Sequence, residues 1–187
     1  MIVTDVDHLV QEPTFIKVPF CKKQFVIEFI RYAQPRELGK LSENIVGTIY
    51  EFLSPPNNEC DFIYKGKRVE VKSSRAYSHL GKRSMCKIHD LSINTSYDCN
   101  IQHVKKNLFD WLFYIVYCDD GLQIFKVASK KITHKTFGYS DSQQRNHMGN
   151  GQFHLNSKTY NRHIKFMIQE LTYEQIYDIL EMSDGFI

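Results

Sequence analysis

Long apolar runs are missing from this chain of 187 residues. A helix needs about 20 consecutive apolar residues to cross a bilayer, so we expect no membrane span. The first residues, Met1 to Asp7, carry neither a positive leader nor a sustained apolar stretch, which argues against a secretory signal. We therefore expect an intracellular protein.

Cysteine pairs and internal repeats are also missing. The five cysteines are an odd number and form no C-x-x-C pair, which argues against a disulfide framework or a zinc ribbon. No repeat, low-complexity tract or Gly/Ser linker marks a boundary, so residues 1–187 are expected to form one domain. The net charge is only +3, so any attraction to nucleic acid must come from the placement of charges.

The apolar pattern predicts an alternation of helices and hairpins. Residues 25–32 fit either a strand or a short helix, because a short apolar run does not reveal its period. The predicted helices are 35–53, 98–110, 157–167 and 172–182, and the predicted hairpins are 61–72 and 112–127. The first strand of the second hairpin, residues 112–117, is apolar throughout and is expected to be central in a sheet. This order indicates an α/β or α+β domain with a mixed sheet covered by helices.

The hairpin at residues 61–72 gathers charge on one face. With Lys65-Gly66 as its loop, Asp61 lies directly opposite Glu70. With Gly66-Lys67 as its loop, Asp61 lies opposite Lys72 and diagonal to Glu70. Both registers place the two carboxylates and the ammonium on the same face. The other face is apolar and carries Phe62, Val69 and Val71.

Two carboxylates this close resist simultaneous ionisation unless a cation relieves their repulsion. Mg²⁺ is the expected cation, because it prefers oxygen ligands and binds one or two carboxylates together with waters and phosphate oxygens. We predict that Asp61, Glu70 and the main-chain carbonyl of Val71 are its ligands. Lys72 is then expected to orient or deprotonate an attacking water, or to offset charge that develops on phosphorus.

A simpler interpretation needs no chemistry. An exposed hairpin commonly carries a cross-strand ion pair between an acidic residue and a lysine, and such a pair contributes little stability.

The arrangement of Asp61, eight intervening residues and then Glu70-Val71-Lys72, on an apolar hairpin after a helix, resembles the PD-(D/E)xK nuclease superfamily. Type II restriction endonucleases are its nearest functional group. The resemblance covers residues 39–127 and implies an α/β, restriction-endonuclease-like core with a central mixed sheet flanked by helices. It also implies Mg²⁺-dependent hydrolysis of phosphodiester bonds, with Asp61, Glu70 and Lys72 as the catalytic trio. Cys60 stands where the motif's name has proline.

The helix that precedes the hairpin adds a fourth candidate. Gly39 to Glu43 is similar to a Gly-xxx-Glu stretch in the first core helix of several members of the superfamily. This similarity implies that Glu43 assists metal binding. A solvated glutamate on the polar face of a helix is the equally acceptable structural interpretation.

The resemblance further implies sequence-specific cleavage of double-stranded DNA by a homodimer. Basic residues near the hairpin are expected to contact phosphates, and they are Arg75, Lys82, Arg83 and Lys87. Residues 133–156 are predicted to be an irregular DNA-recognition segment. Its groups suited to base edges are Gln143, Gln144, Arg145, Asn146 and Asn150. Two alternatives stay open, a structure-specific repair or junction nuclease and a non-catalytic DNA-binding regulatory domain.

Overall fold

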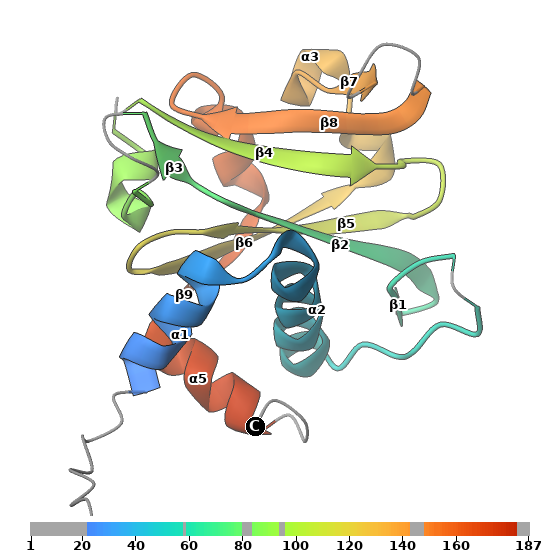
Figure 1. Ribbon diagram of the computed structural model, residues 1–187. Coiled ribbons are helices and arrows are strands. Elements are labelled where there is room, and N and C mark those ends of the chain that lie inside the picture. Colours follow the sequence, from blue (N-terminus) through green and yellow to red (C-terminus); the bar gives the residue numbers. More distant parts are fainter. Residues whose placement is uncertain (1–21, 58, 80–83, 94–95, 143–147, 183–187) are drawn as a thin grey trace, which may run out of the picture.

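The computed structural model describes residues 22–57, 59–79, 84–93, 96–142 and 148–182. These residues form three layers (Figure 1). Helices α1 (Lys22–Tyr32), α2 (Pro35–Tyr50) and α5 (Tyr173–Met182) cover one face of a five-stranded sheet, and a four-stranded sheet covers the other face. No helix within the described ranges is long and apolar enough to cross a membrane.

The five-stranded sheet has the order β1-β2-β5-β6-β9. Its strands are β1 (Phe62–Tyr64), β2 (Lys67–Arg75), β5 (Trp111–Tyr117), β6 (Gly121–Ala128) and β9 (Met167–Thr172). Strands β2 and β5 run parallel, whereas the other neighbouring pairs are antiparallel. The prediction of a mixed α/β protein with a central mixed sheet flanked by helices is therefore confirmed, as are both hairpins.

The four-stranded sheet has the order β3-β4-β8-β7 and is antiparallel throughout. Its strands are β3 (Tyr77–Ser78), β4 (Tyr97–Val104), β8 (Met148–Asn156) and β7 (Ser140–Ser142). Short helical turns complete the described chain, and they are η1 (Ile88–Leu91), η2 (Ser129–Lys131), α3 (His134–Phe137), α4 (Tyr160–His163) and η3 (Ile164–Phe166).

Strand β5 holds the layers together, because its two faces belong to two different cores. Phe113, Ile115 and Tyr117 pack against the helices, while Leu112, Tyr114 and Val116 pack against the four-stranded sheet. A strand buried on both faces must be apolar at every position, which explains the unbroken run at residues 112–117. The prediction that this strand is central is confirmed.

Two of the predicted helices are confirmed and one ambiguity is resolved. Residues 25–32 belong to helix α1, and α5 begins at its predicted cap, where the Thr172 main-chain N–H donates to Gln175 Oε1 at 2.9 Å. Helix α2 ends at Tyr50, earlier than predicted, because Glu51 adopts a left-handed conformation with φ of 52°.

Two predictions for the second half of the chain are wrong, and a third is confirmed in part. The predicted helix at 98–110 is strand β4 followed by a loop. The helix predicted at 157–167 is present as α4 and η3, but it begins only at Tyr160 and ends at Phe166, before β9. The segment at 133–156 is not irregular throughout, since it holds α3, β7 and β8. Tertiary pairing of β8 with β4 overrides the weak local preference of these polar residues.

Candidate functional site

The β1–β2 hairpin adopts the first of the two registers considered. Phe62 pairs with Val69 and Tyr64 pairs with Lys67, so Lys65 and Gly66 form the loop. Their φ angles of 50° and 71° are both left-handed, as the common two-residue hairpin turn requires. This pairing places Asp61, one residue before β1, opposite Glu70 on β2.

Main-chain hydrogen bonds hold Asp61 at this position. Its N–H donates to the Val69 carbonyl at 3.0 Å, and its Oδ2 accepts from the Val71 N–H at 2.7 Å. The carboxylate is therefore fastened beside the strand that carries Glu70 and Lys72.

Lys72 contacts two of the predicted metal ligands at once. Its Nζ forms an ion pair with Glu70 Oε1 and donates to the Val71 carbonyl at 3.3 Å. A side-chain oxygen and a main-chain oxygen thus converge on one cation, here the lysine ammonium. These hard oxygen donors suit Mg²⁺, and a bound ion would take the place that the ammonium now holds.

The carboxylate of Glu43 approaches this cluster from helix α2. Burial raises the pKa of the Glu43 carboxyl, the Asp61 charge raises it further, and the Lys72 ammonium opposes both. Burial also raises the pKa of the Glu70 carboxyl, against the opposing charge of Lys72. Ionisation of the Glu43 and Glu70 carboxyl groups is thus costly in the absence of a cation.

Among the described residues, no three His, Cys, Asp or Glu side chains already stand in the geometry of a metal site. The cluster is a group of neighbouring acidic residues whose nearest compensating cation is Lys72. An incoming ion would have to draw the carboxylates together and release the lysine.

Two cavities open at the cluster. The first has a volume of about 320 Å³ and is lined by Asp61, Glu70, Lys72 and residues from the loop after β4 and the start of β8. The second, of about 510 Å³, lies between α2, the edge of β2 and β4, and Glu43 lines it. Lys72 and His103 line both cavities, so the two adjoin each other, and together they are called the groove below.

Four residues of this groove were missed from the sequence. Asn100, Gln102 and His103 come from β4, and Lys105 follows it. They were missed because residues 98–110 were taken for a helix, whereas period-two alternation from Tyr97 to Ile101 was the available signal for a strand.

The predicted DNA-contacting residues fall into four groups. Asn150 lines the first cavity, beside the acidic cluster. Arg75 lines the second cavity, but its guanidinium donates to the carbonyls of Ile30 and Ala33 at the end of α1. Lys82, Arg83, Gln143, Gln144, Arg145 and Asn146 lie outside the described residues.

Lys87 lies at the other end of the central sheet. Lys87 directly precedes η1. The carbonyl of the neighbouring Cys86 accepts a hydrogen bond from the Asp119 N–H, and Asp119 lies two residues after the end of β5. Glu70 instead pairs with Leu112 near the start of β5, so about 16 Å of strand separates the two regions. Arg75 and Lys87 are therefore not part of the acidic cluster.

Comparison with models of known protein families finds no match to this chain. Comparisons with curated proteins and with solved structures likewise find no match. The site is therefore interpreted from its own geometry.

Proposed function

We propose that this chain is a Mg²⁺-dependent endonuclease that hydrolyses phosphodiester bonds of double-stranded DNA. The observation that carries the proposal is the convergence of Glu70 Oε1 and the Val71 carbonyl on one cation, beside the fastened carboxylate of Asp61. The geometry separates this site from a simple exposed ion pair, because the Lys72 and Glu70 side chains are only 23% and 17% exposed and lie in a cavity.

The residues divide the work according to their chemistry. Asp61, Glu70 and the Val71 carbonyl would hold the ion, which supplies a Lewis acid and an acidified water. Once its ammonium is displaced from Glu70, Lys72 can contact the attacking water or the phosphate oxygens, where negative charge develops. Glu43 lies close enough to Asp61 and Glu70 for their charges to raise its pKa. Its proposed role is to orient water on the α2 side of the cluster.

Positive charge borders the acidic cluster where a phosphate backbone would enter. Lys105 is exposed and lines the first cavity, and Arg36 lines the second cavity at the start of α2. Cations spaced along a groove favour an extended polyanion over a small acidic metabolite. We further propose restriction-type sequence specificity and a homodimer, because a two-fold enzyme presents one active site to each DNA strand.

Incubation with a supercoiled plasmid of mixed sequence tests the proposal. With Mg²⁺ the protein should produce discrete linear fragments, and EDTA should abolish the cleavage. Asp61→Ala and Glu70→Ala should each reduce cleavage at least about 100-fold, because each removes an anionic ligand. Asp178→Ala, which removes an exposed carboxylate from α5, is the matched control and should cleave normally.

The outcomes separate the alternatives. Full activity in Asp61→Ala or Glu70→Ala would refute the metal site. DNA binding without cleavage under any divalent metal would favour the non-catalytic regulatory domain. Cleavage confined to branched or damaged DNA would favour the structure-specific nuclease.

A further inference from the structure

The outer face of the four-stranded sheet is unusually rich in side-chain amides. On β4 the buried residues Tyr97, Cys99 and Ile101 alternate with outward-facing polar residues, and β8 shows the same alternation. The outward-facing residues are Asp98, Asn100 and Gln102 on β4 and Asn150, Gln152, His154 and Asn156 on β8. Asparagine is disfavoured in strands, so three of them on one face require a reason other than sheet stability.

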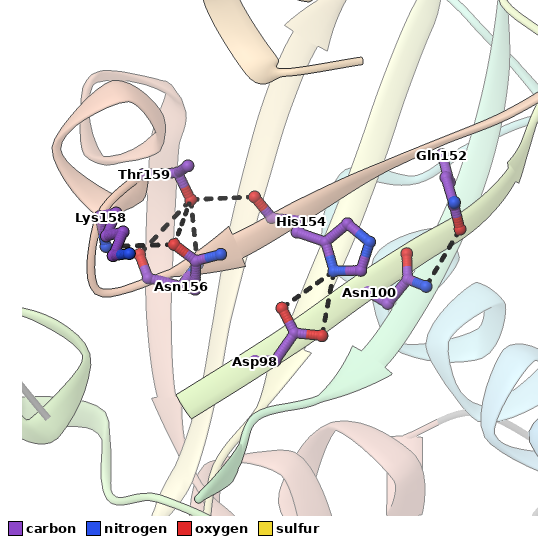
Figure 2. A network of polar contacts seen from close by, with 7 residues as sticks. All are labelled: Asp98, Asn100, Gln152, His154, Asn156, Lys158 and Thr159. Carbon is purple, nitrogen blue, oxygen red and sulfur yellow. Dashed lines mark hydrogen bonds and ion pairs between the residues drawn. The ribbon is translucent and has the colours of Figure 1, made fainter. Parts of the chain in front are cut away.

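The two ends of this face differ in how their hydrogen bonds are used. At the end away from the acidic cavity, His154 Nδ1 bonds both oxygens of Asp98 at 2.9 and 3.0 Å, and Asn156 bonds Thr159 and Lys158 in the following turn (Figure 2). This end is a closed network of protein groups.

The end next to the acidic cavity keeps hydrogen-bonding capacity unused. Asn100 donates to Gln152 Oε1 at 3.1 Å, while its own Oδ1 has no partner within the described residues (Figure 2). Asn150 Oδ1 is likewise buried without a partner in that part of the chain. A buried acceptor without a partner destabilises the protein, and a bound ligand that donates a hydrogen bond would offset this cost once the amide turns toward it.

The shape of this face suits the major groove of duplex DNA. Strands β4 and β8 have eight and nine residues, whereas the outer strands β3 and β7 have only two and three. The face is therefore mostly a two-stranded ribbon, which a major groove about 12 Å wide admits. Residues on one face of a strand lie about 6.6–6.8 Å apart, which matches two base-pair steps of about 3.4 Å.

From these observations we propose that the cavity end of the β4–β8 face, formed by Asn100, Gln102, Asn150 and Gln152, reads adenine edges in the major groove of the DNA substrate. Asparagine and glutamine amides pair bidentately with adenine N6 and N7. The inference rests on the proposed function for the identity of the substrate, because Asn150 lines the cavity of Asp61 and Glu70 and Asn100 lines the adjoining one. It places base reading on strands rather than on residues 143–147.

Binding without cleavage tests this inference separately from hydrolysis. Sequences that the unmodified protein prefers are selected from a random duplex library in Ca²⁺ and again in EDTA, and affinities are measured by fluorescence anisotropy. Asn100→Ala and Gln102→Ala should each weaken binding to the preferred duplex about 5- to 150-fold and change binding to other duplexes little. Gln24→Ala removes an exposed amide from α1 and is the control that should leave both affinities unchanged.

Four results would overturn the inference: equal losses on all duplexes, no loss in either variant with native circular dichroism, tighter binding to duplex RNA, or a preferred sequence that contains no adenine at the contacted positions. If the variants flatten a clear preference while no metal supports cleavage, the reading surface stands and the proposed hydrolysis fails. If cleavage and its specificity persist in both variants, the hydrolysis stands and the reading surface fails.

Discussion

Lys72 is the residue whose role depends most on whether a metal is bound. Without an ion its ammonium neutralises Glu70 and contacts the Val71 carbonyl. In the proposed reaction, an ion on those oxygens would leave the same ammonium free to contact the phosphate. We therefore propose two roles for this side chain, stabilising the metal-free acidic site and taking part in the reaction.

Lys72→Ala should reduce the single-turnover cleavage rate at least about 100-fold while DNA binding persists, because the ammonium acts on charge that develops in the transition state. Lys72→Arg should not restore the rate, since the forked guanidinium neither releases a proton nor fits a compact ammonium position. A rate in either variant equal to that of the unmodified protein would contradict a catalytic Lys72.

Glu43 should make stability depend on pH in a definite direction. Its raised pKa means that the folded protein binds the proton more tightly than the unfolded chain does. The stability that this proton contributes is present below the ordinary glutamate pKa and is lost as the pH rises through the raised folded value.

Glu43→Gln removes this cost, so in EDTA the variant should unfold with a similar free energy at pH 4 and a larger one than the unmodified protein at pH 8. Urea denaturation at the two pH values measures the difference. Asp178→Asn, on the exposed face of α5, is the control variant, because it removes a carboxylate that lies outside the acidic cluster. A Glu43→Gln variant that is less stable at pH 8 than at pH 4, relative to the unmodified protein, would contradict the direction.

At the scale of the element, the bulge in β4 shapes the groove. Ile101 pairs with Phe153 and Val104 pairs with Gly151, so β4 contains one residue more than β8 over this interval. His103 takes up the extra residue with φ of 57°, a left-handed conformation, and lines both cavities. Bulges of this kind re-aim side chains beside functional sites.

His103→Gly should leave the free energy of unfolding unchanged or raise it by up to about 1 kcal/mol, because glycine adopts the left-handed region without the clash that costs other residues about 1–2 kcal/mol. His103→Val should lower it by about 1 kcal/mol or more, since a β-branched residue is poorly tolerated there. Chemical denaturation compares the two, and a valine variant more stable than the glycine variant would refute the strained bulge.

At the scale of the whole molecule, the acidic site is assembled from separate parts of the chain. Glu43 comes from α2, Asp61 precedes β1, and Glu70 lies on β2 beside the central strand β5. The unfolded chain does not hold these groups together, so an ion that needs them binds the folded protein selectively.

Mg²⁺ at about ten times its dissociation constant should therefore stabilise the fold by about 1.4 kcal/mol, which corresponds to a rise of about 3–6 °C in Tm for a chain of this size. Differential scanning calorimetry with and without 10 mM Mg²⁺ measures the rise. Asp61→Ala should show less than half of it, whereas an equal rise in both proteins would indicate that the ion binds elsewhere.

The sequence by itself determined the features that depend on short-range order. The hairpin, the shared face of Asp61, Glu70 and Lys72, and the central position of β5 follow from period-two alternation and turn chemistry within a few residues. The cap of α5 is equally local.

Only the tertiary structure decided what depends on distant pairing. The bulge places the buried Ile101 and Val104 three residues apart, which is the spacing typical of a helix. Only the pairing of β4 with β8 shows that this segment is a strand. Because β8 is far along the chain and polar on one face, the amide surface and the groove exist only once the two strands meet. The approach of Glu43 to Asp61 likewise depends on how α2 packs against β2, which no local pattern specifies.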